Sequence, residues 1–344
     1  ANFLSRFFKL RSPNIAIDLG TANTLVYMKG KGIVLNEPSV IAVNRQSGEV
    51  LATGHDAWDM IGRTPSYIVA VRPLRGGAIT DFDITERMIR LLLQRVGVSR
   101  FTRPKVVICV PSAITEVERR AVTDATRRAG ASDAQLIEQP MAAAIGANLP
   151  IDEPVGNMVI DIGGGTTETA VLSLGGIVAL EAVRVGSFDI DTEIQSHVRR
   201  NHGIAIGERT AEEIKKSIGS AMPMPGDTDA EVRGRDLVTG LPKTVILTSK
   251  EIREAINPVV TQMVDSVVRC LGVAPPELSQ DFLKRGMYLV GGGSLLRGMA
   301  ERISNETRVP VNMSNEPLEA VVLGAGHCIE NYAALRGLFM DSRR

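Results

Sequence analysis

Short apolar runs alternate along the chain with longer amphipathic segments. Within residues 104–131, an apolar run ends at a Pro-Ser turn and an amphipathic segment follows. The apolar stripe of that segment comprises Ile114, Val117, Ala121, Val122 and Ala125. Gly130 is its expected end. Residues 134–149 and 286–303 repeat the order of strand, turn and helix. This alternation predicts the α/β fold class.

Two stretches of the chain share one design. "DLGTANTLVYMKGKGIVL" (18–35) and "DIGGGTTETAVLSLGGIVAL" (161–180) each begin where an apolar strand ends in Asp, and each continues through a Gly/Thr turn into further strands. The two aspartates lie close to half a chain apart, which indicates duplicated domains rather than a short solenoid repeat. Two like halves that face each other would bring both acidic glycine turns to one cleft.

The residues of these turns suit a phosphate group and a divalent cation. Glycines let backbone N–H groups approach an anion closely, and threonine hydroxyls add donors. A carboxylate beside a phosphate, here Asp18 or Asp161, requires a cation between them, and Mg²⁺ uses one or two carboxylates together with phosphate oxygens. The alternative for either turn alone is an ordinary tight hairpin. No GxxxxGK[ST] P-loop and no G-x-G-x-x-G Rossmann pattern is present, so the pair of turns predicts the nucleotide site.

Four segments resemble, in order, the motifs of the actin/Hsp70/sugar-kinase superfamily. "DLGTANT", "LIEQPMAAAIGA", "DIGGGTTE" and "LVGGGSLLRG" are similar to its phosphate-1, connecting, phosphate-2 and adenosine motifs. The flanking segments "GKGIVLNEPSVIAV", "AVRPLRGGAITDF" and "VPSAITEVERRA" resemble the MreB family of bacterial actin-like cell-shape proteins. The resemblance extends from Asn14 to about Gly326.

The resemblance implies an actin-like α/β fold of two lobes, with duplicated RNase-H-like cores and the nucleotide in the cleft between the lobes. An N-terminal segment would precede the lobes, and each lobe would carry an inserted small subdomain. The implied divisions are 1–12 for the segment, 13–150 plus 327–344 for lobe I with its insertion at about 35–75, and 151–326 for lobe II with its insertion at about 182–250.

The same resemblance implies ATP and Mg²⁺ as ligands. The first phosphate loop would be Gly20, Thr21, Ala22 and Asn23, and the second Gly163, Gly164, Gly165 and Thr166. Asp18 and Asp161 would position Mg²⁺ through its waters. The adenosine would lie near Glu212, Glu213, Ile214 and Lys215, with Gly291, Gly292, Gly293 and Ser294 on its other side. Thr210 and Glu213 have capping-box spacing, which predicts a helix start; the alternative is an ordinary amphipathic helix.

The connecting segment departs from the bacterial family pattern at one position. Gln139 stands where the family's water-activating glutamate is expected. A glutamine amide cannot act as a general base, but it can orient an attacking water. Glu138 is adjacent, but neighbouring side chains of an extended strand point to opposite faces, so it cannot simply replace the glutamate. The catalytic candidates are therefore Gln139 with Thr166, with Glu138 beside them, and we expect slow hydrolysis.

The first residues, "ANFLSRFFKL", hold three of the eight phenylalanines in the chain. On a helix, Phe3, Leu4, Phe7, Phe8 and Leu10 fall within an arc of about 160°, opposite Arg6 and Lys9. Such a segment is typical of an interfacial membrane helix, and the alternative is packing against the protein. The resemblance favours membrane binding by this segment over packing against the protein. The loop "GVSRFTRP" (97–104), with Val98 and Phe101 among arginines, is a second candidate contact.

The composition argues against several other classes of function. Lys+Arg and Asp+Glu both number 39, so the chain lacks the basic field of a dedicated nucleic-acid binder. Three separated cysteines fit a reducing cytosol, and no apolar run is long enough to span a membrane, so we expect a cytoplasmic protein. His197 and His202 are five residues apart and are not expected to share a helix face, so no metal site is predicted from histidine spacing.

The predicted function is that of an ATP-binding filament protein at the inner face of the cytoplasmic membrane. The resemblance implies homopolymers, a role in cell shape, and transmembrane cell-shape and cell-wall synthesis proteins as partners. Slow hydrolysis suits a polymer because nucleotide state can bias subunit contacts. A small-molecule kinase of the same superfamily is the alternative. A chaperone ATPase is disfavoured because Arg344 follows the second lobe closely, without a peptide-binding domain.

Overall fold

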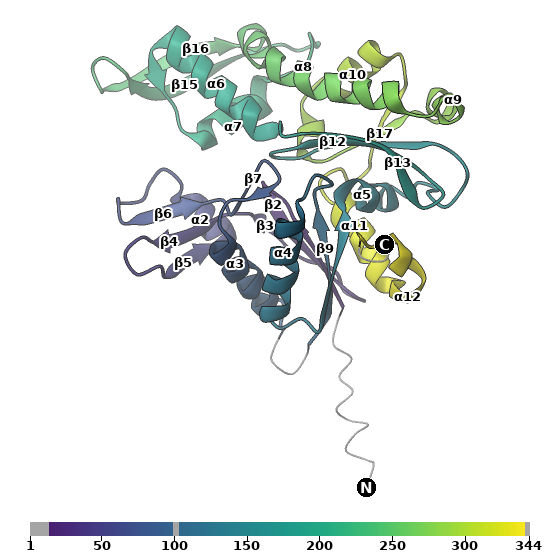
Figure 1. The fold of residues 1–344 in the computed structure, drawn as a ribbon. Coiled ribbons are helices and arrows are strands. Elements are labelled where there is room, and N and C mark those ends of the chain that lie inside the picture. Colours follow the sequence, from purple (N-terminus) through teal and green to yellow (C-terminus); the bar gives the residue numbers. More distant parts are fainter. Residues whose placement is uncertain (1–13, 99–102, 341–344) are drawn as a thin grey trace. The chain divides into compact units, whose positions relative to one another are not determined.

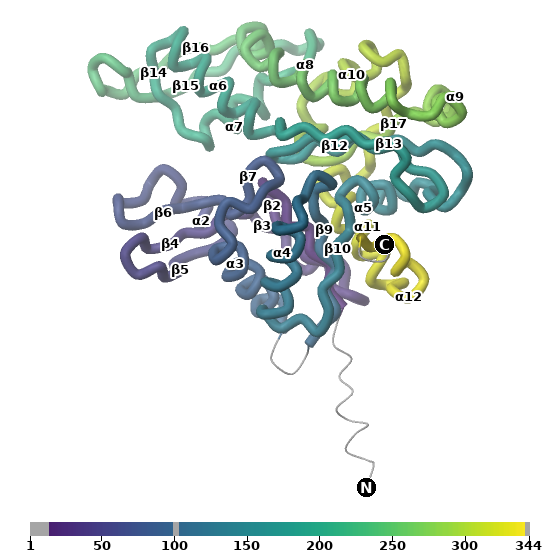
Figure 2. The backbone as a smooth tube through the Cα atoms, in the orientation of Figure 1, coloured from purple at the N-terminus to yellow at the C-terminus, as the bar shows by residue number. Residues whose placement is uncertain are grey.

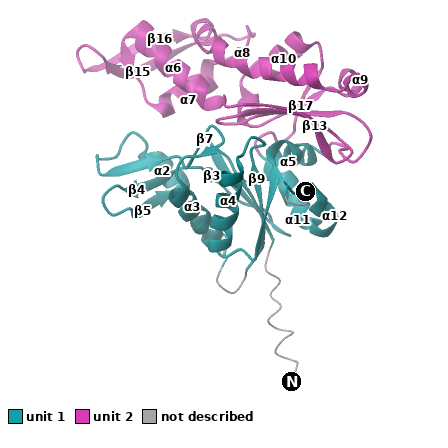
Figure 3. Cartoon of the chain, in the orientation of Figure 1, with its two compact units in different colours: residues 1–148, 319–344 teal, residues 149–318 magenta. Residues whose placement is uncertain are grey.

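The computed structural model describes residues 14–98 and 103–340. The chain forms two compact units (Figure 3): unit 1 comprises residues 1–148 and 319–344, and unit 2 comprises residues 149–318. Figure 2 follows the backbone from unit 1 into unit 2 and back again. The return lies at Glu319, earlier than the predicted residue 327, because the helix Ala320–Glu330 belongs as a whole to unit 1.

A five-stranded sheet forms the centre of unit 1. Its order is β10-β9-β1-β2-β3, where β1 is Ile15–Leu19, β2 Asn23–Met28, β3 Gly32–Pro38, β9 Lys105–Val110 and β10 Asp133–Glu138. The strand β1 pairs antiparallel with β2 and parallel with β9, and all five of its residues are buried. Burial on both faces explains why this strand reads as a continuous apolar run.

Unit 2 repeats this sheet. Its order is β13-β12-β11-β17-β18, where β11 is Asn157–Ile162, β12 Thr167–Ser173, β13 Gly176–Val183, β17 Met287–Val290 and β18 Val311–Met313. The strand β11 again pairs antiparallel with the next strand and parallel with a strand from later in the chain. The two sheets therefore have the same arrangement of strands, as the sequence duplication predicts. Figure 1 shows the elements of both units in the colours of their sequence positions.

Helices cover both faces of the unit 1 sheet. They are α3 (Phe82–Arg95), α4 (Glu116–Arg128), α5 (Gln139–Gly146), α11 (Ala320–Glu330) and α12 (Tyr332–Leu335), followed by the 3-10 turn Arg336–Leu338. The helix α2 (Gly54–Met60) packs instead in a separate small cluster with Val40 and Ala42. Ile15 and Ile17 share a core cluster with residues of α3 and α4, whereas the Cys109 sulfur on β9 lies 3.9 Å from the Val321 carbonyl of α11. Alternating strand residues thus face opposite helix layers.

The helix α4 begins and ends where local chemistry requires. Thr115 and Glu118 form a capping box at its start, and Gly130, with φ +117°, follows its last turn. The prediction that Val117 belongs to the apolar stripe is wrong, because this side chain is 69% exposed. Val117 lies in the first helical turn, on the outer side of the helix from the buried Val122.

The helices of unit 2 pack around one large core. They are α6 (Ser187–His202), α7 (Glu208–Ile218), α8 (Ser249–Val273), α9 (Pro276–Arg285) and α10 (Met299–Thr307), with a 3-10 turn at Gly292–Leu295. Ile160 of β11, Ile194 of α6 and Ile256 of α8 are fully buried members of this core. Within the described residues, no helix combines the length and the apolar character needed to cross a bilayer.

Each unit also carries a small antiparallel sheet. In unit 1 the order is β5-β4-β6, from β4 Ile41–Asn44, β5 Val50–Thr53 and β6 Ile68–Val71, followed by the hairpin of β7 Leu74–Arg75 and β8 Ala78–Ile79. In unit 2 the order is β14-β15-β16, from β14 Ile204–Ala205, β15 Asp229–Asp236 and β16 Pro242–Thr248. Both three-stranded sheets lie within the ranges predicted for inserted subdomains, about 35–75 and 182–250, whereas the hairpin extends beyond the first range.

Candidate functional site

Unit 1 brings Asp18 and Gln139 together from distant parts of the chain. Asp18 lies near the end of β1 and is 8% exposed, and Gln139 is the first residue of α5. The parallel strands β1, β9 and β10 place their carboxyl ends at one edge of the sheet, so the residue that follows β10 reaches the end of β1. The Gln139 Nε2 atom donates a hydrogen bond of 3.3 Å to Asp18 Oδ1.

This contact fixes the orientation of the Gln139 amide. An ionised carboxylate accepts hydrogen bonds only, so the NH₂ group must face Asp18 and the amide oxygen remains as an acceptor. Glu138 ends β10 and precedes α5 as its N-cap residue. The expectation that both residues lie on an extended strand is therefore wrong for Gln139, which has already entered the helix.

The first glycine turn is tight. The Gly20 amide donates to the Asn23 carbonyl at 3.1 Å, and a Cβ on Gly20 would lie 2.6 Å from the same oxygen, so only glycine fits without a shift. Ser39, which sequence reasoning missed, supports the turn. Its hydroxyl donates to the Gly20 carbonyl at 2.6 Å and its amide donates to the Ala22 carbonyl at 2.8 Å. Ser39 directly follows β3, whose pairing with β2 places it there, and no local pattern could have identified it.

The second glycine turn rests on the start of α6. The Ser187 and Phe188 amides donate to the Gly163 and Gly164 carbonyls at 3.0 and 2.9 Å. In a planar trans peptide the next N–H points opposite to the C=O. The amides of Gly164 and of the residue after it therefore point away from α6, as successive donors that could hold an anion.

Gly186 was also missed by the sequence analysis, although it is essential to this arrangement. It is the N-cap residue of α6, and a Cβ there would lie 2.6 Å from the Gly164 backbone. The Gly186 amide donates to Asp189 Oδ2 at 2.7 Å, which ties the turn to the helix start. Thr166 closes the turn through its carbonyl, which accepts from the Gly163 amide at 2.8 Å.

Asp161 and the Gly291 turn meet in unit 2. Asp161 pairs with Val290 in the parallel ladder between β11 and β17, so Gly291 comes to lie beside the carboxylate. Gly291 has φ +83°, and a Cβ there would overlap the Asp161 carboxylate and the Ile162 carbonyl. Two segments that are far apart in the sequence are thus held in one place by strand pairing.

The Asp161 carboxylate is suited to a cation. It is 8% exposed, and burial raises its pKa to about 6. No residue in the described part of the chain donates a hydrogen bond to it. A buried carboxylate without a partner is costly, and a divalent cation would remove that cost. The donor set therefore fits Mg²⁺, which prefers carboxylate, phosphate and water oxygens.

The residues around Gly291 have different exposures. Gly292 is exposed, whereas Gly293 and Ser294 are buried. A Cβ on Gly293 would overlap the Ile162 side chain, and the Ser294 hydroxyl donates back to the Gly291 carbonyl. Backbone at Gly291 and Gly292 is therefore the part of this turn that a ligand could reach.

The segment 212–215 lies inside α7 rather than at its start. The helix begins at Glu208 with Gly207 as its N-cap residue and no side-chain cap, so the predicted capping box of Thr210 and Glu213 is wrong. Ile214 is 3% exposed and packs in the core, while Glu212 forms an ion pair with Lys216 at 2.8 Å. Glu213 is exposed.

Lys215 connects α7 to the start of α6. Its Nζ atom donates to Ser187 Oγ at 2.7 Å and lies 2.9 Å from the Asp191 carboxylate. Burial raises the pKa of Asp191 to about 6, although the Lys215 ammonium lowers it. Since Ser187 also supports the second glycine turn, Lys215 stabilises the position of that turn from behind.

The predicted membrane residues Phe3, Leu4, Phe7, Phe8 and Leu10 lie outside the described residues, as does Phe101. Val98 is described, and the expectation that it contacts a membrane is wrong. Its side chain is 7% exposed and packs in the core of unit 1.

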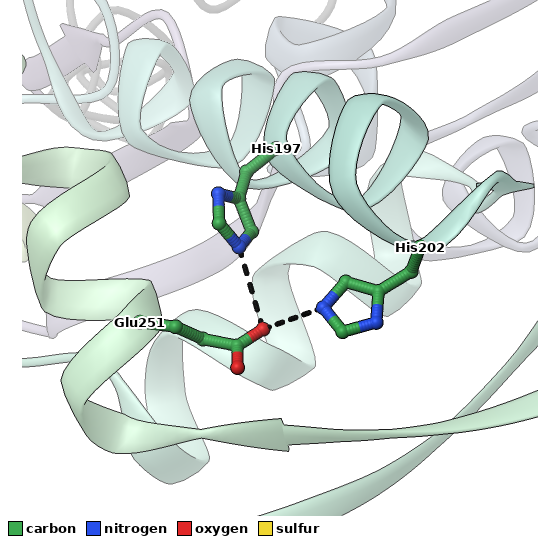
Figure 4. Close-up of side chains that lie close together, drawn as sticks. All are labelled: His197, His202 and Glu251. Atoms are coloured by element: carbon green, nitrogen blue, oxygen red, sulfur yellow. Dashed lines mark hydrogen bonds and ion pairs between the residues drawn. The ribbon is translucent and has the colours of Figure 1, made fainter.

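The two histidines, which were not expected to share a helix face, nevertheless meet at one carboxylate. His197 and His202 both lie on α6, and both ring Nε2 atoms reach Glu251 Oε1 of α8, at 3.3 and 2.7 Å (Figure 4). The spacing of five residues does not bring the two Cβ atoms onto one face. Instead, both side chains reach Glu251, which belongs to another helix.

Comparisons with known proteins identify the family of this chain. A family model described as "MreB/Mbl protein" matches residues 12–337. The cell shape-determining protein MreB of Escherichia coli (strain K12) is 48% identical over 333 residues, covering 95% of this chain and 96% of that protein. The cell shape-determining protein Mbl of Bacillus subtilis (strain 168) is 44% identical over 319 residues, covering 92% of this chain and 96% of that protein.

Solved structures give the same result. MreB5 of Spiroplasma citri bound to ADP superimposes with a TM-score of 0.90 at 34% identity, covering 96% of this chain and 98% of the other. A MamK double helical filament matches with a TM-score of 0.78 at 18% identity, covering 92% and 98%, which supports the fold alone. The actin-like fold is thereby confirmed.

Proposed function

The chain belongs to the MreB/Mbl family, and from that premise we propose that it binds ATP with Mg²⁺ and polymerises into filaments at the inner face of the cytoplasmic membrane, where they organise cell-wall synthesis. Relatives in this family are named as cell shape-determining proteins. The structures of MreB5 were solved with ADP and with AMPPNP, which supports an adenine nucleotide as the ligand here.

One observation supports the nucleotide proposal most directly. In unit 2, three groups belong to one sheet edge: the outward amides of the second glycine turn, the Gly291 backbone, and the Asp161 carboxylate, to which no described residue donates. Amide donors suit phosphate oxygens, and the carboxylate suits Mg²⁺. Asp18 stands at the matching position of the unit 1 sheet and would act in the same way.

Gln139 would orient the water that attacks the terminal phosphate. Its NH₂ group is held by Asp18, which leaves the amide oxygen to accept a hydrogen bond from that water. The Thr166 hydroxyl has no partner among the described residues and could help to place the same water. Because glutamine cannot take the proton, hydrolysis would be slow, and the bound nucleotide would act as a timer for filament contacts.

Sedimentation and single-turnover hydrolysis test these roles. With ATP and Mg²⁺ the wild type should pellet as polymer, and Asp161→Asn should lose both nucleotide binding and pelleting. Gln139→Ala should bind ATP normally but hydrolyse it more slowly. His55→Gln, on an exposed residue of α2, is the matched control and should behave as the wild type. A wild type that remains monomeric with ATP would instead favour a small-molecule kinase.

The membrane proposal depends on residues 2–11 and is tested separately. Deleting them should abolish pelleting with anionic liposomes while ATP-dependent assembly continues. A single short helix binds reversibly, but many such helices aligned along a filament would bind strongly. Replacing Phe7 and Phe8 by serine should weaken binding, whereas replacing Asn2 and Ser5 on the polar face by alanine should not. Undiminished liposome binding after the deletion would place the anchor elsewhere.

A further inference from the structure

His197, His202 and Glu251 form a compact cluster in unit 2 (Figure 4). One nitrogen from each imidazole and one carboxylate oxygen all lie within 4.8 Å of one another. The ring centroids are 6.0 Å apart and the ring planes are tilted by 59°, so the rings are not stacked. Both Nε2 atoms point toward the single oxygen Oε1 of Glu251. Three donor atoms from two helices therefore converge on one point.

The carboxylate is held in place by its own helix. Glu251 lies in the first turn of α8, where its amide donates to Thr248 Oγ1 at 3.1 Å and its Oε2 accepts from the same hydroxyl at 3.3 Å. Burial tends to raise the pKa of Glu251, but hydrogen bonds from His202 and His197 outweigh this and lower it. The contacts with Thr248 thus orient the carboxylate, with Oε1 left for the imidazoles. Outer contacts of this kind orient the ligands of metal sites.

The distances match a small divalent metal. Zn²⁺ binds imidazole nitrogen and carboxylate oxygen at about 2.0–2.2 Å in tetrahedral geometry, which separates neighbouring ligand atoms by roughly 3.3 Å. The separation between His197 Nε2 and Glu251 Oε1 is 3.3 Å, and that between His202 Nε2 and the same oxygen is 2.7 Å. To bind Zn²⁺, the distance between His202 Nε2 and Glu251 Oε1 would have to increase only from 2.7 Å to roughly 3.3 Å.

The cluster is also accessible. The side chains of His197, His202 and Glu251 are 13%, 23% and 26% exposed, so an ion can enter and a water can complete its coordination. The nearby Lys243 is neutralised by Asp236 at 3.2 Å, and its ammonium faces the His202 carbonyl rather than the rings. The three cysteines of the chain are buried and would not compete for the metal.

We propose that His197, His202 and Glu251 form a binding site for a divalent transition metal, with Zn²⁺ as the best-fitting ion. The ion would replace the imidazole N–H groups as the partner of Glu251 and would join the last turns of α6 to the first turn of α8. Since α6 carries the second glycine turn at its other end, the metal would stabilise the helix that supports this turn. The site is independent of the proposed nucleotide function.

The test uses the full chain without a histidine tag, freed of metal by EDTA and dialysis. Competition with a chromophoric chelator should show one tight Zn²⁺ per chain, and Zn²⁺ should raise Tm. Co²⁺ should give the intense visible absorption of tetrahedral coordination. His202→Gln and Glu251→Gln should each weaken Zn²⁺ binding on the order of 100-fold. His55→Gln, which removes an exposed histidine outside the cluster, should bind Zn²⁺ as the wild type does.

Several results would overturn the proposal. They are the absence of tight Zn²⁺ binding by the wild type, an octahedral Co²⁺ spectrum, and equal Zn²⁺ affinity in the wild type and both cluster variants. Circular dichroism and the Tm of the metal-free variants show whether they fold. If a variant unfolds, the Co²⁺ spectrum and stoichiometry of the wild type and of His55→Gln still decide the question.

Discussion

The substitution Gly324→Ala tests how closely α5 and α11 pack in unit 1. A Cβ on Gly324 would overlap the Ala142 carbonyl oxygen and lie 2.7 Å from its carbonyl carbon. Gly146, on the other helix, meets the Ala320 carbonyl in the same reciprocal way. Each helix therefore presents a glycine to the backbone of its neighbour, and alanine at either position must push the helices apart.

The distances set the size of the effect. Ordinary contacts of a Cβ begin at 3.4 Å, so the helices must separate by about 0.7 Å to clear the Ala142 carbonyl carbon, and by more to clear its oxygen. A gap of roughly 0.5–1 Å forfeits a quarter to a half of the dispersion energy across the contact. Overpacked cores lose about 1–3 kcal/mol, and sometimes more, against a gain of about 1 kcal/mol in helix propensity. Because the overlap is with backbone rather than with a side chain, we expect the upper part of this difference, a net loss of about 1–2 kcal/mol.

Urea unfolding and calorimetry measure this loss. For a unit of this size, about 1–2 kcal/mol corresponds to a fall in Tm of roughly 2–8 °C. Gly272→Ala is the matched control: Gly272 is an exposed helical glycine of α8 with nothing within 4 Å of the added Cβ. This change should leave stability unchanged or increase it by up to about 1 kcal/mol.

The same substitution has a second readout, which rests on the proposed hydrolysis. The helix α5 begins at Gln139, so displacing it should shift the amide relative to Asp18 and slow single-turnover hydrolysis by up to about 100-fold. Equal stability of Gly324→Ala and the wild type would refute the reasoning, because the helices could not then be in backbone contact.

Three further predictions concern a buried ion pair, two buried thiols and a glycine turn. Lys215→Met leaves Asp191 buried without its cation and should lower the free energy of unfolding, measured in urea, by about 3 kcal/mol. Adding Asp191→Leu should recover most of this stability, and no recovery would contradict the pairing. Burial raises the pKa of the Cys270 and Cys328 thiols to about 12. Iodoacetamide at neutral pH should therefore modify these thiols only after the protein unfolds, and their rapid alkylation in the native protein would contradict this burial. Gly291→Ala should lower Tm and weaken ATP binding, because Gly291 has φ +83° and an added Cβ would overlap Asp161 and Ile162 of β11. A thermal-shift assay with and without ATP measures both effects, and finding neither would count against the site.

Local sequence features predicted the architecture because they depend on near neighbours. Apolar runs that end in Asp18 and Asp161 indicate buried strands followed by glycine turns, and both sheets have that form. Gly130 was predicted as the end of α4 and lies just after its last turn, because a glycine stop acts within a few residues. Exposure within a helix was less predictable, as Val117 demonstrates.

The candidate site was predictable only in its glycines and carboxylates. Ser39, Gly186 and the bracing role of Lys215 depend on which strand or helix lies behind each turn. Such partners have no local pattern, since strand pairing and helix packing select them from distant parts of the chain. The predicted capping box at Thr210 was wrong because α7 extends further toward the N-terminus than that spacing indicates.

The sequence by itself determined the α/β class, the duplicated sheets and the two acidic turns, because each arises from short-range periodicity and from the freedom of glycine. The tertiary structure alone decided what His197 and His202 do. Five residues along a helix separate them by about 140° around its axis, which argues against a shared role. The start of α8 places Glu251 between them, and long side chains can bridge an angle that Cβ positions cannot.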